Sequence, residues 1–143
     1  MKVKKFNVSE VGLNHFFGPL EARIMGIIWS SDGISIKDVQ GILSGENPIS
    51  FNAVMTVMNR LLEKGHLKKF TEGSGRGRIS CYQPVQSKEQ FLMEQTQAVT
   101  FGLIQEYGDL VVNHMIDALE GANPEMIAKL QMKLNEVKSR ERP

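Results

Sequence analysis

Apolar residues recur with helical spacing between residues 50 and 65. Four of them follow the i, i+3, i+4, i+7 spacing that places side chains on one face of a helix: Val54, Val57, Met58 and Leu61. Ser50 precedes this run as an N-cap, and Gly65 follows it as a stop signal. The pattern therefore predicts an amphipathic helix with its apolar face in a core.

A short hairpin is predicted directly after this helix. Residues 66–71 can extend as a strand, and residues 79–83 alternate well enough to return as its partner. The tip between them is rich in glycine and contains Arg76 and Arg78. No helix begins after these glycines, which argues against a phosphate-binding nucleotide loop.

The rest of the chain is predicted to be helical. Residues 1–18 show no clear period and are expected to form an N-terminal arm. One helix is predicted over residues 19–29, and a second follows Ser35 as its cap. Beyond Pro84, three more helices are separated near Gly108 and Gly121. The expected fold is mainly α with a small β wing: a winged helix-turn-helix domain at 19–86 and a helical domain at 87–143.

The polar side of the helix after Ser50 suits contact with DNA. Asn52, Thr56, Asn59 and Arg60 have hydrogen-bonding side chains of the lengths that reach base edges and phosphates. Two arginines in a glycine-rich wing can bind phosphates or enter a minor groove. The alternatives are an ordinary solvated helix face and a flexible hairpin tip.

Charge divides the chain into a basic and an acidic part. The net charge of +1 is the sum of +4 over residues 1–86 and −3 over residues 87–143. This asymmetry hints at a nucleic-acid-binding part joined to another function. No apolar run approaches the length of a membrane span, and the basic start lacks the apolar stretch of a signal peptide, so we expect a cytoplasmic protein without membrane contact.

The C-terminal part is expected to form a homodimer. Its 57 residues bury too little surface to be stable alone, and dimerisation is the simplest remedy. A two-fold dimer would also read an inverted repeat. The alternative is packing against the N-terminal domain. The residues expected in the dimer interface are Phe91, Leu103, Ile104, Val111, Met115, Ile116, Leu119, Ile127, Leu130 and Leu134.

Four motifs in order resemble the penicillinase repressor family, which includes the beta-lactamase, methicillin-resistance and copper-responsive repressors of bacteria. They are GPLEARIMGIIW at 18–29, ISIKDV at 34–39, AVMTVMNRLLEKG at 53–65, and the wing with RGR at 76–78 and YQP at 82–84. The likeness covers about residues 13–140. It implies a homodimeric winged-helix repressor that binds a palindromic operator and blocks a promoter.

The resemblance also assigns roles to individual positions. It implies that the major groove is faced by Ser50, Asn52, Ala53, Thr56 and Asn59, and that Arg60, Arg76 and Arg78 contact the DNA backbone. Some family members are released by a sensor protease that cuts an Asn–Phe bond, and this sequence contains no such pair. The copper-responsive members end in a cysteine-rich hook, whereas Cys81 is the only cysteine here.

Catalytic and metal sites are not indicated. His15, His66 and His114 are scattered without ligand spacing, and pairing His66 with Cys81 would supply only two ligands. We therefore expect no cofactor and no enzyme. Cys81 is expected to fill a strand position as a small apolar group. A winged-helix protein-interaction module without sequence-specific DNA binding is the alternative to a repressor.

Overall fold

The computed structural model describes residues 6–8 and 10–141, and it divides the chain into two compact units, Met1–Ala98 and Val99–Pro143. This division falls within a helix, because residues on the first turns of that helix are buried in the first unit. The boundary expected near residue 86 stays a prediction. Residues 1–5 and 9 of the expected arm, and residues 142–143 of the expected helical domain, lie outside the described residues.

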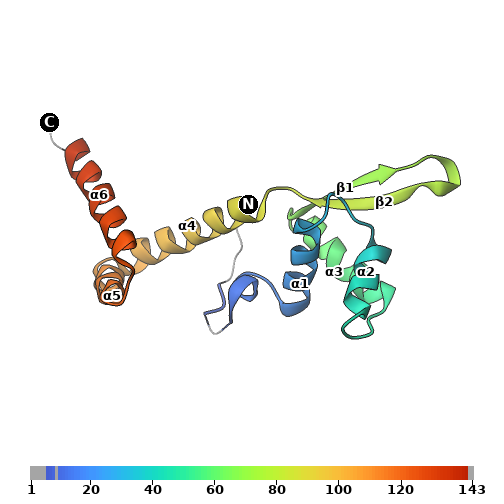
Figure 1. Ribbon diagram of the computed structural model, residues 1–143, viewed down its shortest axis with the longest axis horizontal. Coiled ribbons are helices and arrows are strands. Elements are labelled where there is room, and N and C mark those ends of the chain that lie inside the picture. The colour runs from blue at the N-terminus through green and yellow to red at the C-terminus, as the bar shows by residue number, and fades with distance from the viewer. Residues whose placement is uncertain (1–5, 9, 142–143) are drawn as a thin grey trace. The chain divides into compact units, whose positions relative to one another are not determined.

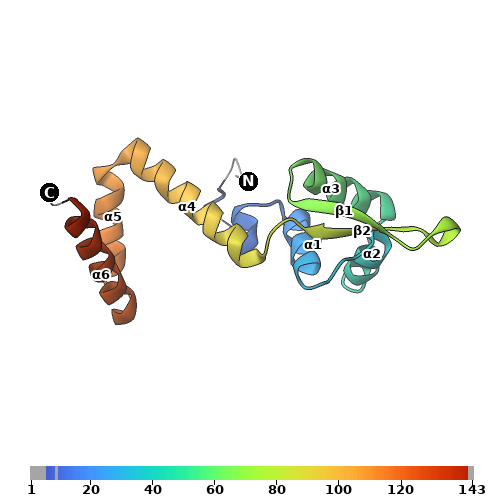
Figure 2. The same ribbon diagram turned by 90° about the horizontal axis from the view of Figure 1, so that it is seen from above.

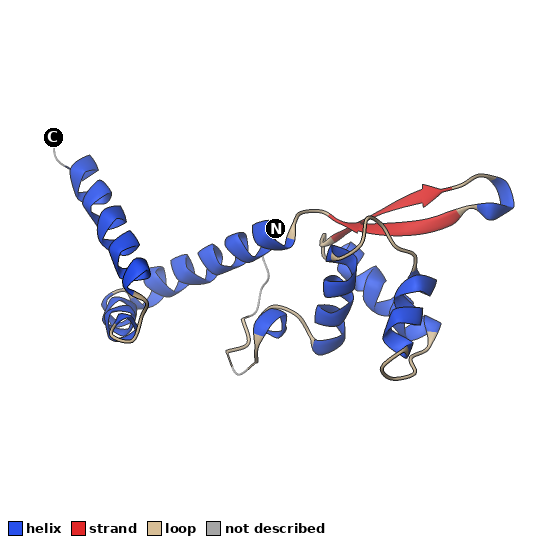
Figure 3. Cartoon of the chain, in the orientation of Figure 1, coloured by secondary structure: helices blue, strands red, loops and turns tan. Residues whose placement is uncertain are grey.

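The first unit contains helices and one β-hairpin, which Figure 3 colours blue and red. Its elements in chain order are the short 3-10 helix η1 (Gly12–His15), α1 (Pro19–Trp29), α2 (Ile36–Ser44), α3 (Phe51–Glu63), β1 (Leu67–Glu72), the 3-10 turn η2 (Gly75–Gly77) and β2 (Ile79–Pro84). The predicted helices and hairpin are present, and each strand ends one residue later than expected.

The helices begin where the sequence places their caps. The Ser35 hydroxyl accepts a hydrogen bond from the Asp38 N–H, and the Ser50 hydroxyl accepts one from the Ala53 N–H, both at 3.1 Å. These bonds satisfy backbone donors that a helix start leaves unpaired. The four residues predicted for the inner face of α3 are all buried: Val54, Val57, Met58 and Leu61. They pack with inner residues of α1 and α2, which include Ile24, Ile28, Val39 and Leu43.

The hairpin forms a wing that extends beyond the helices in both views (Figures 1 and 2). β1 and β2 are antiparallel, with Leu67 opposite Pro84 and Glu72 opposite Ile79. Ile34, in the loop before α2, exchanges two backbone hydrogen bonds with Tyr82 and so anchors the base of the wing. Gly73 has φ +83°, and a Cβ there would lie 2.7 Å from the Gly77 carbonyl oxygen, so the tip requires glycine at this position.

An aromatic cluster joins residues near the start of the first unit to residues near its end. Phe17 stacks on Phe91 at 5.1 Å between ring centroids, and His66 lies edge-on to both rings. Trp29 also contacts Phe91, and its indole N–H donates to the Gln86 carbonyl at 3.0 Å. Two expectations are corrected here. Residues 12–17 of the expected arm are part of the folded unit, because Gly12–His15 form η1 and Phe16 and Phe17 are buried. Phe91 is not an interface residue, because this cluster buries it.

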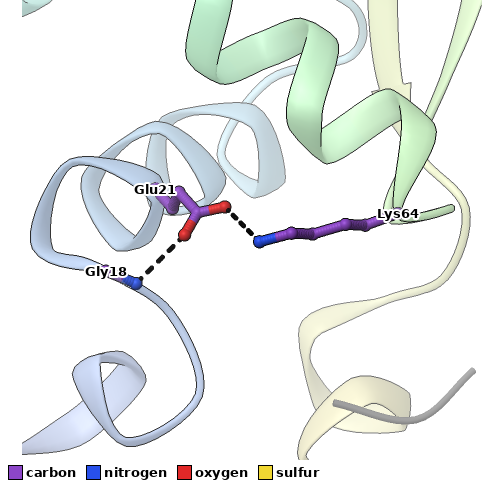
Figure 4. A network of polar contacts seen from close by, with 3 residues as sticks. All are labelled: Gly18, Glu21 and Lys64. Atoms are coloured by element: carbon purple, nitrogen blue, oxygen red, sulfur yellow. Dashed lines mark hydrogen bonds and ion pairs between the residues drawn. The ribbon is translucent and has the colours of Figure 1, made fainter. Parts of the chain in front are cut away.

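Glu21 joins the start of α1 to the end of α3 (Figure 4). One carboxylate oxygen accepts a hydrogen bond from the Gly18 N–H at 3.2 Å, and the other accepts one from the Lys64 ammonium at 3.0 Å. Burial by itself raises the pKa of Glu21, but the bonds from Lys64 and Gly18 outweigh it, so the pKa lies below its ordinary value of 4.5. The bridge therefore stabilises the folded chain above pH 4.5, and its contribution is lost as the pH falls through the lower folded-state pKa.

His66 makes the folded unit sensitive to mild acid. Its Nδ1 atom is buried without a hydrogen-bond partner. Burial and the nearby Lys64 ammonium lower its pKa from 6.5, and the Glu21 carboxylate opposes them only in part. The unfolded chain therefore binds the proton more readily, and stability falls as the pH drops below 6.5 toward the folded-state pKa.

Replacing His66 by phenylalanine removes this sensitivity. The variant is expected to be more stable than the wild type by about 1 kcal/mol near neutral pH, because it eliminates a buried unpaired polar atom. The difference should grow as the pH falls from 6.5. Urea unfolding of both proteins from pH 5 to 8 measures it, and a constant difference across that range would contradict the assignment.

The second unit consists of helices. The long helix α4 (Lys88–Tyr107) begins in the first unit, and α5 (Asp109–Leu119) and α6 (Pro124–Glu141) follow. From Val99 to Arg140, every described side chain is exposed or only half-buried. Within the described ranges, none of the helices has both the length and the apolar content of a membrane span.

Candidate nucleic-acid interface

The outer face of α3 is polar and exposed, as predicted. Asn52, Thr56, Asn59 and Arg60 are all exposed, whereas Ala53 is half-buried. They lie opposite the buried residues of the same helix, so their exposure follows from the 3.6-residue period. The face offers amide and guanidinium groups, which pair with base edges and phosphates.

Hydrogen bonds within α3 restrict what its two hydroxyl groups can do. The Thr56 hydroxyl donates to the Asn52 carbonyl at 2.8 Å, so it presents a methyl group and an acceptor oxygen to the outside. The Ser50 hydroxyl oxygen already accepts the Ala53 N–H, and its own O–H stays available as a donor. Thr and Ser hydroxyls can form hydrogen bonds either with the backbone or with an external partner. The sequence alone therefore did not predict these restrictions.

The wing carries its two arginines at the tip. Arg76 lies in η2, Arg78 follows that turn, and both are exposed. Within the described part of the chain, neither guanidinium forms an ion pair with a carboxylate. Both can therefore bind an external anion without first breaking an internal bridge.

An open groove of about 760 Å³ separates α3 from the wing and the start of α2. Asn59 of α3 and Arg78 of the wing, both predicted from the sequence, line it. The groove is also lined by Lys37 on the first turn of α2 and Lys69 on β1, which were not among the site residues predicted from the sequence. Lys69 could have been found, because it shares the short basic strand segment with Lys68.

Acidic groups occupy the same groove. Asp38 and Glu72 line it, and their carboxylates repel phosphate. Cys81 lines the groove as well, and its thiol is largely buried, so burial and the charges of Glu72 and Asp38 raise its pKa. Cys81 is therefore a neutral thiol that fills a strand position, as expected.

Comparison with known proteins identifies the chain. The sequence model of the family described as penicillinase repressor matches residues 17–136. The chain belongs to this family. Penicillinase repressors are DNA-binding transcriptional regulators, and α1 to β2 form the winged helix-turn-helix that such proteins use. A search of curated protein sequences found no match.

A comparison with solved structures matches bacterial regulators, including the following three. The apo form of MarR from E. coli is 13% identical, covers 85% of this chain and 78% of its own, and gives a TM-score of 0.41. A MarR/EmrR family regulator from Acinetobacter sp. ADP1 is 16% identical, with coverages of 90% and 79% and a TM-score of 0.43. Bacillus subtilis PadR in complex with operator DNA is 14% identical, with coverages of 89% and 80% and a TM-score of 0.45.

The remaining site residues predicted for this penicillinase repressor lie in the second unit. Leu103, Ile104, Met115, Ile116 and Leu134 are exposed in the single chain. The other four predicted interface residues are half-buried: Val111, Leu119, Ile127 and Leu130. The structure thus leaves apolar side chains uncovered on all three helices of this unit.

Proposed function

We propose that this penicillinase repressor acts as a homodimer that binds a palindromic operator and represses by occluding the promoter. One observation supports DNA contact above others: Asn59 on α3 and Arg78 on the wing line the same groove. A base-reading helix and a phosphate-binding wing must lie on one side of the domain to engage one duplex.

The second unit is expected to bind a second copy of the chain. No described side chain from Val99 to Arg140 is buried, yet the unit presents large apolar residues such as Phe101, Leu110 and Ile116. Exposed apolar side chains of this number mark an interaction surface. A two-fold dimer through these helices covers them and supplies the second DNA-reading domain that a palindrome requires.

Selection of bound sites from a random DNA pool tests the proposed function. The full-length protein should enrich an inverted repeat whose half-site centres are separated by about 10 bp or a multiple of it, because each domain must face the same side of the duplex. Enrichment of an asymmetric single site would contradict the dimeric arrangement. Absence of binding to any duplex at low salt would favour the protein-interaction module instead.

Replacing Asn59 by alanine should change the ranking of bound sequences rather than affinity for all DNA. A lost bidentate contact with one base reduces discrimination at that position by about 1–3 kcal/mol. Repeating the selection with the variant measures this change. Asn113→Ala, which removes an exposed asparagine from α5, is the matched control and should leave the ranking intact. A uniform loss across sequences would place Asn59 on the backbone.

A further inference from the structure

Phe51 is an exposed aromatic residue at the start of the polar DNA-facing helix. It is the first residue of α3, and 43% of its surface is exposed. The inner residues of the same helix, from Val54 to Leu61, are buried. Phe51 is therefore only partly covered by the packing that holds α3 in place.

The local structure of the helix start does not account for an aromatic residue at position 51. Ser50 is the N-cap and accepts the Ala53 N–H. The residues that stand where a hydrophobic staple forms, one before the cap and four after it, are Ile49 and Val54. Aromatic residues also have a lower helix propensity than Ala or Leu, so the phenyl ring does not serve helix formation.

Phe51 borders the groove between α3 and the wing. Met55, one turn further along α3, and Ile79, at the start of β2, line the same groove. Ile79 is exposed as well, and Met55 is half-buried. An apolar strip therefore adjoins the hydrogen-bonding face formed by Asn52, Thr56 and Asn59.

We propose that Phe51 contacts the C5-methyl group of a thymine in each half-site and so determines specificity at that base pair. In the helix-turn-helix arrangement, residues near the N-terminus of the recognition helix contact base edges. Thymine is the one base that presents an apolar group in the major groove, and phenylalanine is among the side chains that contact it. This inference rests on the proposed function, because it requires α3 to enter the major groove.

The test removes one methyl group at a time from a bound duplex. Full-length protein is titrated by fluorescence anisotropy into a duplex recovered from the random pool, with each thymine in turn replaced by deoxyuridine. The wild type should lose about fourfold in affinity at one thymine per half-site, the effect of losing one buried methyl group. Phe51→Ala should be insensitive at that thymine, whereas Phe51→Leu should retain part of the effect.

A matched control separates this contact from a general loss of apolar surface. Ile42→Ala removes a side chain that is 53% exposed on α2 and lines a different groove, against α1. This variant should show the same deoxyuridine response as the wild type. All variants are compared by thermal unfolding, and the exposure of Phe51 and Ile42 predicts small changes in stability.

Three results would overturn the inference alone. The first is a wild-type protein whose affinity does not change when any thymine methyl group is removed, or whose selected site contains no thymine. The second is a thymine at which wild type and Phe51→Ala lose equally, since another side chain then reads that methyl. The third is an equal weakening of all duplexes by Phe51→Ala, which indicates that the effect of Phe51 does not depend on the base sequence. Failure to bind any duplex would instead overturn the proposed function as well.

Discussion

Replacing both Arg76 and Arg78 by alanine is expected to weaken binding to every duplex by a similar factor and to flatten its salt dependence. Each phosphate contact contributes about 0.9 to the slope of log affinity against log salt, so losing two in each protomer, four in the dimer, should reduce that slope by about 3.6. At 0.1 M salt this corresponds to a loss of roughly 4,000-fold for the dimer. Because both residues are exposed at the wing tip, the fold should be unaffected.

The control for this variant removes the same charge elsewhere. Lys129→Ala with Arg140→Ala eliminates two exposed basic residues from α6 and leaves the wing intact. It should retain nearly the full salt slope, because the removed charges lie on the second unit. Binding isotherms at four or five salt concentrations measure both variants. If the wing variant kept the wild-type slope, Arg76 and Arg78 would not bind phosphates.

Introducing charge into the apolar surface of the second unit is expected to produce a monomer. Met115 and Leu134 are 42% and 53% exposed in the single chain, and both belong to the proposed dimer interface. Replacing each by glutamate would bury two carboxylates per chain on dimerisation, which costs several kcal/mol per ion. Sedimentation at micromolar concentration should therefore show a monomer. The affinity for a full palindrome should fall on the order of 100-fold, because the two half-sites are no longer bound by a linked pair.

The same charge on the outer sides of these helices should be harmless. Asn113→Glu with Ala128→Glu places two carboxylates on exposed positions of α5 and α6 that lie away from the apolar stripes. This control should remain dimeric with unchanged operator affinity. A Met115→Glu, Leu134→Glu protein that sedimented as the wild-type dimer would show that the interface lies elsewhere.

Local patterns were sufficient for the elements of the DNA-binding unit. The apolar spacing from Val54 to Leu61 predicted α3 and its buried face, and Ser35 and Ser50 predicted the caps that the hydrogen bonds confirm. Glycine-rich composition predicted the turn of the wing. These features depend on neighbours within a few residues, so a single sequence contains the information that determines them.

Phe91 shows where such patterns fail. Its helical position marked it as apolar and inward-facing, but nothing nearby in the sequence distinguished a dimer interface from the aromatic cluster with Phe17 and His66 that buries it. Phe16 and Phe17 were assigned to an arm for the same reason, since their partners are distant in sequence. The partner of an apolar side chain is decided by tertiary packing.

The sequence by itself determined the order of helices and strands, the polar face of α3, the arginines of the wing and the likeness to penicillinase repressors, because each rests on local spacing or on motifs. Tertiary structure decided that α2, α3 and the wing share one groove, that Lys37, Lys69 and Phe51 border it, and that α4 begins inside the first unit. Those outcomes depend on how residues far apart in the chain pack together, and that packing is governed by the burial of apolar surface rather than by sequence separation.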